Sequence, residues 1–371
     1  MRLVIPFRNR ARNSKCCYSM PRLHYLGTLI VVLISYFGCF VPTTLAQQTD
    51  APKTQFLEYL ALAEKGDPKA QFMLGGCFLE GLGVLKDPAE AVKWYRKAAE
   101  QNFAPAQHNL GTAFHYGRGV KQDYEEAVKW YRKAAEQNLG EAQNSMGFCY
   151  RDGYGVGKNY FEAVKWYRKA AEQGMVEAQA SLGLCYASGF GVDKDYAEAL
   201  KWYLLAAEKN SSGAQQSIAS FYAMGLVGPK DDGKAAEWFR RAAEQGEAVA
   251  QYNLGVHLKR GLGVGQNHVE AAKWFRKAAE QNYAAAQKSL GNCYQRGEGL
   301  DQDIVEAYAW WSLAAATVPQ AAADRNSLAD QMSPDQILAD FKRAKELRIL
   351  IEQALNLKPW KPQRTVYFLQ P

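Results

Sequence analysis

The chain has 371 residues, 48% of them hydrophobic, so it is able to bury a large core. Its net charge of +7 would suit a nucleic-acid partner, but the excess belongs to residues 1–46, which hold six Lys or Arg and no Asp or Glu. The rest of the chain balances 39 basic against 38 acidic residues. This balance excludes a basic surface for DNA or RNA on the body of the protein.

Residues 1–46 predict an export leader. The sixteen-residue apolar run Leu26–Val41 follows basic residues and precedes PTTLAQQ, so we expect a signal peptide that is cleaved after Ala46. An uncleaved membrane anchor is the alternative, although about 17 residues is the lower limit for a spanning helix. A short polar linker is expected over residues 47–55.

Two details of the leader concern its start and its anchoring. Met20 begins a short basic segment directly before the apolar run, so it is a better start for a signal peptide than Met1. A lipid anchor at Cys39 is disfavoured, because Tyr36 and Phe37 occupy positions where the processing motif requires small or aliphatic residues.

Tryptophan recurs every 36 residues through the body of the chain. The positions are Trp94, Trp130, Trp166, Trp202, Trp238, Trp274 and Trp310. A fixed period of this length is typical of stacked repeats, in which each unit needs its neighbours to bury its apolar face. We expect a leading half repeat and seven full repeats over residues 56–316.

Each repeat predicts two helices, which we call helix A and helix B. In helix A, Ala106, Leu110 and Phe114 lie at helical spacing before Gly117 and Gly119 end the helix. Helix B carries one apolar stripe opposite a charged face. In the first full copy the stripe consists of Ala91, Trp94, Tyr95, Ala98 and Ala99.

Helix B has clear start and stop signals. Every copy begins with an N-cap Asp or Asn, followed three residues later by Glu in a capping-box pattern, except in the fifth copy, which has Lys234. These N-cap residues are Asp87, Asp123, Asn159, Asp195, Asp231, Asn267 and Asp303. The exit residue is always Gly or Asn, the types that best tolerate a left-handed conformation. The exit residues are Gly66, Asn102, Asn138, Gly174, Asn210, Gly246 and Asn282.

The repeated strings AQ-x-x-LG-x-x-Y-x-x-G-x-GV and D-x-x-E-A-x-K-W-Y-x-x-A-A-E-x-G resemble the Sel-one-like repeat (SLR), a relative of the tetratricopeptide repeat. The resemblance covers residues 56–316. It implies an all-α fold, a right-handed α/α superhelical solenoid of 36-residue helix-turn-helix repeats, used as a scaffold or adaptor and often exported in bacteria. The fifth copy departs at Ala219 and at Gly225–Pro229, where we expect a different loop geometry.

Residues 317–357 predict two capping helices that seal the end of the stack. The segment Pro319–Met332 is a degenerate helix, and the next helix begins with Ser333 as N-cap and Gln336 as its box partner. Its expected core stripe is Ile337, Phe341, Ala344, Ile351 and Leu355. Residues 358–371 hold three prolines and are expected to form a tail.

Four cysteines follow the leader, each 17 residues before a repeated tryptophan. They are Cys77, Cys149, Cys185 and Cys293. A shared packing position on helix A favours buried, reduced thiols, because adjacent helices lie about 10 Å apart and a disulfide needs Cα atoms within about 7 Å. The resemblance implies that the cysteine-rich branch of the family bridges helix A to helix B within one repeat, and this chain lacks the second cysteine. We expect no disulfide.

No catalytic residue, metal or cofactor is expected. The segment Gly153–Lys158 has the wrong spacing for a phosphate-binding loop, and no nucleophile elbow occurs. His108 and His115 are seven residues apart, but two ligands do not complete a zinc site.

The copies differ most along one face of helix A. We call it the variable face and define it by Phe72, Gly76 and Leu79 of the first copy and by their equivalents in the other six. In the related tetratricopeptide arrangement these positions line the concave, peptide-binding side. The predicted partner-binding residues are Phe72, His108, Thr112, His115, Asn144, Phe148, Arg151, Leu184, Tyr252, Val256, Lys259, Lys288 and Asn292.

The centre of the variable face predicts an apolar anchor, Phe148 with Leu184, with Arg151 providing a basic rim beside Tyr252. Lys288 with Asn292 resembles half of a carboxylate clamp, but no following full repeat supplies the other half, so we do not predict that ligand. The alternative is that these positions vary because nothing constrains them.

The predicted function is a non-catalytic protein–protein interaction scaffold of the bacterial cell envelope or exterior, periplasmic or secreted, whose partner is a protein or peptide. The alternative implied by the resemblance is a protein that binds or hydrolyses cell-wall precursors or antibiotics, as suggested for the cysteine-rich branch. An embedded acid–base or nucleophile set would distinguish the two, and we find none in the sequence.

Overall fold

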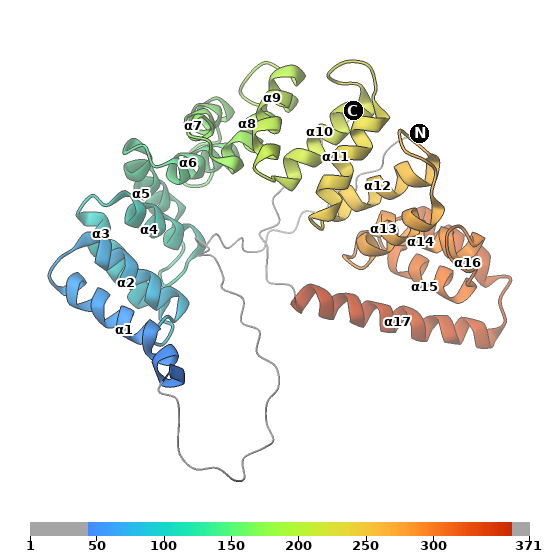
Figure 1. Ribbon diagram of the computed structural model, residues 1–371, viewed down its shortest axis with the longest axis horizontal. Helices are drawn as coiled ribbons and strands as arrows, with labels where there is room; N and C mark the ends of the chain where they lie inside the picture. Colours follow the sequence, from blue (N-terminus) through green and yellow to red (C-terminus); the bar gives the residue numbers. More distant parts are fainter. Residues whose placement is uncertain (1–43, 358–371) are drawn as a thin grey trace, which may run out of the picture. The chain divides into compact units, whose positions relative to one another are not determined.

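The computed structural model describes residues 44–357, which form 17 helices and, within that range, no strand (Figure 1). The helices A are α2 (Pro68–Glu80), α4 (Ala104–Tyr116), α6 (Gly140–Asp152), α8 (Val176–Ser188), α10 (Ser212–Met224), α12 (Ala248–Arg260) and α14 (Ala284–Arg296). The helices B are α3 (Pro88–Glu100), α5 (Tyr124–Glu136), α7 (Tyr160–Glu172), α9 (Tyr196–Glu208), α11 (Asp232–Glu244), α13 (His268–Ala279) and α15 (Ile304–Ala314). Before them lies α1 (Thr44–Glu64), and after them α16 (Pro319–Ala329) and α17 (Pro334–Leu357).

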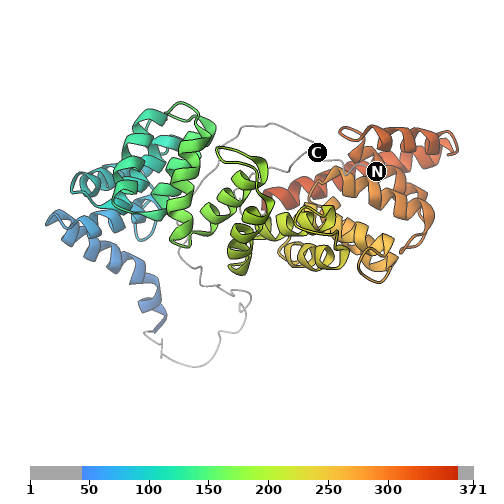
Figure 2. The ribbon, with the colours of Figure 1, turned by 90° about the horizontal axis from the view of Figure 1, so that it is seen from above.

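Consecutive helices pack side by side, as α4 does on α5 and α12 on α13 (Figures 1 and 2). This arrangement confirms the predicted all-α solenoid of helix-turn-helix repeats. The chain divides at Ala170, within α7, into two compact units. We call residues 44–170 the N-terminal unit and residues 171–357 the C-terminal unit, and describe each by itself.

The start of the described chain differs from the prediction. Residues 47–55, expected as a linker, belong to α1, which begins at Thr44 and also contains the expected cleavage position after Ala46. The apolar run, Met20 and the tail at 358–371 lie outside the described residues. Between Thr44 and Leu357, no helix combines the length and the apolar character needed to cross a membrane.

The core lies between helix A and helix B of each repeat. The predicted stripe of α3 is buried, with Ala91 and Ala98 fully covered. In the second copy a Cβ added to Gly111 of α4 would lie 2.7 Å from Cδ1 of the Tyr131 ring, so the glycine lets α5 approach. The recurring Leu-Gly pair is therefore a packing contact between the two helices.

The helix ends confirm the exit signals of the sequence. All seven exit residues have a left-handed backbone, as Asn102 does with φ 63° and Gly66 with φ 93°. In the fifth copy Gly225 still ends α10 with φ 67°, but the second loop glycine is Gly228 with φ 136° and no neighbour near its Cβ position. The second loop glycine of the third copy, Gly155, instead lies against the backbone of α5. The fifth loop therefore differs in geometry, as expected.

The capping box of helix B is only half formed. The N-cap Asp123 accepts a hydrogen bond from the backbone N–H of Glu126 at 3.0 Å, as predicted. Its own N–H already donates to the carbonyl of Phe114 in the preceding helix A at 2.9 Å, so the box glutamate is not needed there. Glu126 instead accepts from Trp130 Nε1 at 2.9 Å and pairs with Lys129 at 3.1 Å. The same glutamate–tryptophan bond recurs in the fourth, sixth and seventh copies.

The last helix, α17, has the predicted capping box but a different core face. Ser333 N–H donates to Gln336 Oε1 at 2.9 Å, and Gln336 N–H donates to Ser333 Oγ at 3.3 Å. The stripe expected to include Phe341 and Leu355 is wrong at those two residues, which are 62% and 41% exposed. The buried residues on this helix are Leu347 and Ile351.

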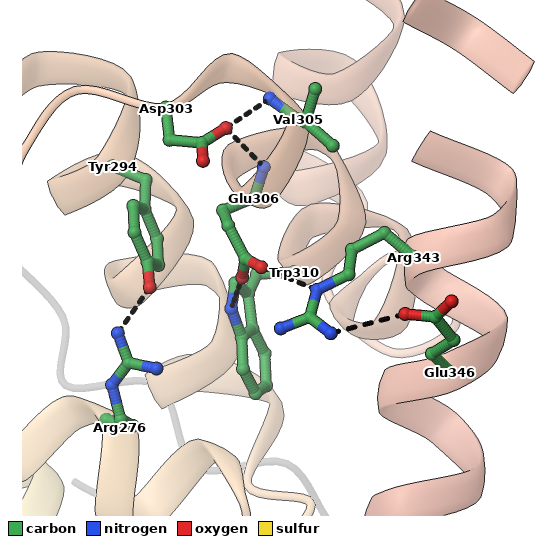
Figure 3. Close-up of polar contacts among 8 residues, drawn as sticks. All are labelled: Arg276, Tyr294, Asp303, Val305, Glu306, Trp310, Arg343 and Glu346. Carbon is green, nitrogen blue, oxygen red and sulfur yellow. Dashed lines mark hydrogen bonds and ion pairs between the residues drawn. The ribbon is translucent and has the colours of Figure 1, made fainter. Parts of the chain in front are cut away.

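An ion pair joins α17 to α15. Arg343 Nε lies 2.5 Å from Glu306 Oε1, and its Nη1 lies 3.3 Å from Glu346 (Figure 3). Since positions 343, 347 and 351 are four residues apart, they share one side of the helix. Arg343 therefore lies on the same side of α17 as the buried Leu347 and Ile351, while Phe341 is exposed and its ring lies 6.4 Å from that of Tyr308 on α15.

Candidate functional site

A buried glutamine in each helix A bonds that helix to the end of the helix before it. In the second copy, Gln107 Nε2 donates to the Ala99 carbonyl of the preceding helix B at 3.2 Å, and its Oε1 accepts from Gln137 Nε2 of the following helix B at 2.7 Å. Sequence reasoning missed this role, although the signal was the recurrence of glutamine in all seven copies. They are Gln71, Gln107, Gln143, Gln179, Gln215, Gln251 and Gln287.

The variable face of the N-terminal unit is half-buried, because its side chains bond to neighbouring helices. His108 Nε2 lies 3.2 Å from Ser145 Oγ of the next helix A, and Thr112 Oγ1 accepts from Tyr131 OH at 3.3 Å. Burial lowers the pKa of His108 to about 4, so its imidazole is neutral at pH 7.

His115 lies inside an aromatic cluster that we define as His115, Tyr124, Phe148 and Tyr154. The ring centroid of His115 is 5.0 Å from that of Tyr124, 5.8 Å from Phe148 and 5.3 Å from Tyr154. Its side chain is buried, and this burial lowers its pKa to about 4. The predicted partner-binding residue is therefore a buried, neutral ring in contact with Phe148.

The predicted basic rim is neutralised. Arg151 stacks on the Phe148 ring at 4.7 Å, as expected of an anchor with a neighbouring cation. Both Nε and Nη2 of Arg151 also donate to the Asp152 carboxylate at 2.8 Å, and the two side chains are 14% and 23% exposed. The next residue therefore supplies a counter-charge to Arg151, and the role of Arg151 in binding stays a prediction.

The remaining predicted residues of this unit have packing contacts as well. Phe72 lies against Tyr95 and Phe103, with ring centroids 5.7 and 5.6 Å away. Asn144 is half-buried on α6. Among residues 44–357, no three His, Cys, Asp or Glu side chains are placed to hold a metal ion.

The C-terminal unit carries a second stretch of the variable face. Tyr252 packs on Phe275 and Tyr283, with centroids 5.8 and 5.4 Å away. Lys259 forms an ion pair with Glu298 at 2.5 Å, so this predicted binding residue also has an acidic partner within the chain. Leu184 and Val256 are half-buried, while Phe148 belongs to the other unit, so its grouping with Leu184 and Tyr252 stays a prediction.

The two residues of the half clamp, Lys288 and Asn292, bond to other residues of the same chain. Lys288 pairs with Asp324 of α16 at 3.3 Å, and Asn292 Oδ1 accepts from Trp311 Nε1 at 3.1 Å. A carboxylate of the protein itself therefore lies where a carboxylate ligand would. This contact comes from α16, which the sequence identified only as a degenerate helix.

The four cysteines have the predicted environment. Cys77, Cys149, Cys185 and Cys293 are buried free thiols on helices A. Burial raises the pKa of Cys149 to about 12, so this thiol stays protonated and unreactive at neutral pH.

Comparisons with known proteins match this architecture. The Sel1 repeat matches seven consecutive segments, residues 68–103, 104–139, 140–175, 176–211, 212–247, 248–283 and 284–316. A Sel1 repeat protein from Oxalobacter formigenes is 35% identical, with 74% of this chain and 79% of that chain covered and a TM-score of 0.63. The protective antigen c5321 of uropathogenic Escherichia coli, which has an SLR fold, is 31% identical, with 84% and 83% covered and a TM-score of 0.39. No curated protein matches the chain.

Proposed function

Because the chain belongs to the Sel1 repeat family, whose members generally serve as protein-interaction scaffolds, we propose that it is a non-catalytic adaptor that binds a partner protein or extended peptide on the variable face. The observation that supports this most directly is Phe148. Its ring is only partly covered, stacks with Arg151 and contacts the buried ring of His115. A rigid aromatic side chain with arginine beside it is the composition of binding hot spots.

The electrostatics of the face favour one class of partner. Its three basic residues, Arg151, Lys259 and Lys288, each pair with an acid of the same chain, and burial keeps His108 and His115 neutral. An acidic ligand would have to displace these pairs. The partner segment is therefore an uncharged one with an apolar or aromatic side chain, and its binding depends little on salt.

The test is in-cell crosslinking of the exported protein, followed by identification of what co-purifies. Phe148→Ala and Tyr252→Ala, made separately, probe the two units, and Phe161→Ala is the matched control, because Phe161 is 59% exposed on a helix B. We expect at least one variable-face variant to lose the partner while helix content holds and the control retains it. Equal recovery from all three variants would place binding elsewhere.

Salt separates the partner classes in the same assay. Recovery from washes at about 0.05 M and about 0.5 M salt should agree within about twofold, because no free charge pair is broken. A large loss at high salt would contradict an uncharged partner segment without contradicting the adaptor function.

The adaptor is proposed to act in the periplasm or outside the cell, with membrane anchoring by an uncleaved leader as the alternative. The proposal rests on the basic and apolar pattern before residue 47. Replacing Met20→Leu tests it: export should fall sharply if synthesis begins at Met20, and the mature protein should begin after Ala46. Full-length protein in the cytoplasm of the unaltered strain would refute export.

A further inference from the structure

The capping helix α17 exposes more large apolar side chains than any other helix between Thr44 and Leu357. They are Leu338, Phe341, Ile349, Leu350 and Leu355, which are 57%, 62%, 43%, 55% and 41% exposed. Single exposed apolar residues are ordinary, but several along one helix mark a contact surface. The helix therefore carries a second contact surface besides the side that packs on α15.

Four of these side chains share one side of α17. Steps of three and four residues place positions 338, 341, 345, 349, 352 and 355 within about 120° of one another around the helix. We call these six exposed residues the seam. They are Leu338, Phe341, Lys345, Ile349, Glu352 and Leu355. Leu350 lies about 100° around the helix from Ile349, outside the seam.

The side of α17 that packs on α15 is a different one. It carries the buried Leu347 and Ile351, together with Arg343, which forms an ion pair with α15. The seam meets α15 at one edge, where the ring of Phe341 lies 6.4 Å from that of Tyr308. Because Phe341 is still 62% exposed, this contact covers only an edge of the seam.

The charges of the seam are complementary to a second copy of the same helix. We infer that two copies of the protein associate through α17, with the two helices antiparallel about a two-fold axis at Ile349. Lys345 then faces Glu352 of the other copy, because these residues lie four positions before and three positions after Ile349. The two-fold axis forms this ion pair twice.

The apolar residues of the seam fit the same arrangement. Ile349 of one copy meets Ile349 of the other at the axis, and Phe341 meets Leu355, since these two lie eight positions before and six positions after the axis. The overlap from 341 to 355 is about 21 Å long. A parallel pairing would instead place Lys345 on Lys345 and Glu352 on Glu352, and such like-charge contacts are unfavourable.

The area of this contact suits a weak, reversible dimer. Burying the exposed parts of Phe341, Ile349 and Leu355 in both copies, with the stems of Lys345 and Glu352, removes roughly 800–1,000 Å² from water. Interfaces of this size lie at the lower end of specific association. We therefore expect a dissociation constant on the order of 10 µM, with monomers well below this concentration and dimers well above it.

Analytical ultracentrifugation of the protein purified from cells, from about 1 µM to about 100 µM, tests the inference. The mass should rise from that of one chain to that of two and stop there, because a two-fold pairing is closed. Phe341→Ser should weaken dimerisation at least about tenfold. Leu350→Ser is the matched control, because Leu350 is similarly exposed on the same helix but lies outside the seam, and it should leave dimerisation unchanged. Far-UV circular dichroism should show the same helix content in all three proteins.

A charge exchange tests the antiparallel pairing itself. Lys345→Glu or Glu352→Lys alone should weaken the dimer about tenfold, because each places like charges in contact twice. The double variant should dimerise like the unaltered protein, because opposite charges face each other again. A monomer at every concentration would refute the inference, as would a dimer that Phe341→Ser leaves intact or an assembly that grows beyond two copies. A double variant as weak as the single ones would refute it as well.

Discussion

Gly111 shows how the absence of one side chain sets the distance between two helices. An added Cβ would lie 2.7 Å from Tyr131 and 3.0 Å from the carbonyl oxygen of Ala127, so either the ring or the backbone of α5 must move. We expect Gly111→Ala to lower the free energy of unfolding by about 1–3 kcal/mol, as overpacking does, when measured by urea denaturation.

The control for this prediction is Gly157→Ala in the loop before α7, where an added Cβ meets nothing within 4 Å. Its effect should stay within about 0.5 kcal/mol, as for most surface substitutions. A loss as large as that of Gly111→Ala would show that glycine flexibility, and not close approach, is the cause.

His115 makes the protein sensitive to acid. Burial lowers its pKa from 6.5 to about 4 in the folded state, with the nearby Asp152 opposing the shift. Because the unfolded chain binds the proton more readily, the stability contributed by neutral His115 is complete above pH 6.5 and is lost as the pH falls toward 4. Between about pH 7 and about pH 5 this loss amounts to about 2 kcal/mol.

His115→Phe removes the titrating group while keeping an aromatic ring in the cluster. Urea denaturation at both pH values should show that the variant loses about 2 kcal/mol less than the unaltered protein on going from pH 7 to pH 5. An unchanged pH dependence would contradict the assignment, since His108 and the carboxylates titrate in both proteins.

Among the elements, α17 shows how a capping helix compensates for a change in the last repeat. In most helices B a lysine follows the first-turn glutamate by three residues, as Lys129 follows Glu126 and pairs with it. The seventh copy has a buried Ala309 at that position, and Arg343 of α17 supplies the missing cation to Glu306 (Figure 3). The capping helix thus provides, from a separate element, the cation for the glutamate that most repeats provide within helix B.

We expect Arg343→Met to lower the free energy of unfolding by about 1 kcal/mol, because it leaves the poorly exposed Glu306 without its cation. Chemical denaturation measures this loss. Adding Glu306→Gln should recover part of it, whereas Arg348→Met, at an exposed position on the same helix, should have little effect. Equal effects from both arginines would refute a specific role for Arg343.

At the scale of the whole molecule, the repeat is the unit that can be removed. Deleting residues 104–139 joins Phe103 to Gly140, so Gln143 then faces the Ala99 carbonyl that Gln107 normally binds. We expect this variant to fold and to unfold in one cooperative transition. The slope of its free energy of unfolding against urea concentration should be about a tenth smaller, in proportion to the lost surface.

Deleting only residues 104–121 removes α4 but keeps α5, whose Tyr131 then lacks its glycine-lined neighbour. Circular dichroism and urea denaturation should show loss of the cooperative transition. If both deletions behave alike, the helix pair is not the unit of stability.

The sequence by itself determined the helix pairs, their N-caps and their left-handed exits, because these depend on local spacing and on single residues such as Asp123 and Asn102. It also located the buried cysteines, since a position shared between repeats has a shared environment. The variable face itself stays a prediction.

Only the tertiary structure decided which groups meet across the repeats. Glu126 bonds Trp130 because the preceding helix A already accepts the N-cap amide, and Arg343 of α17 pairs with Glu306 of α15. Asp152 pairs with Arg151 and Asp324 pairs with Lys288, and the sequence did not predict either partner. The physical reason is that spacing fixes which side of a helix a residue occupies, while the identity and charge of the group facing it depend on how separate helices pack.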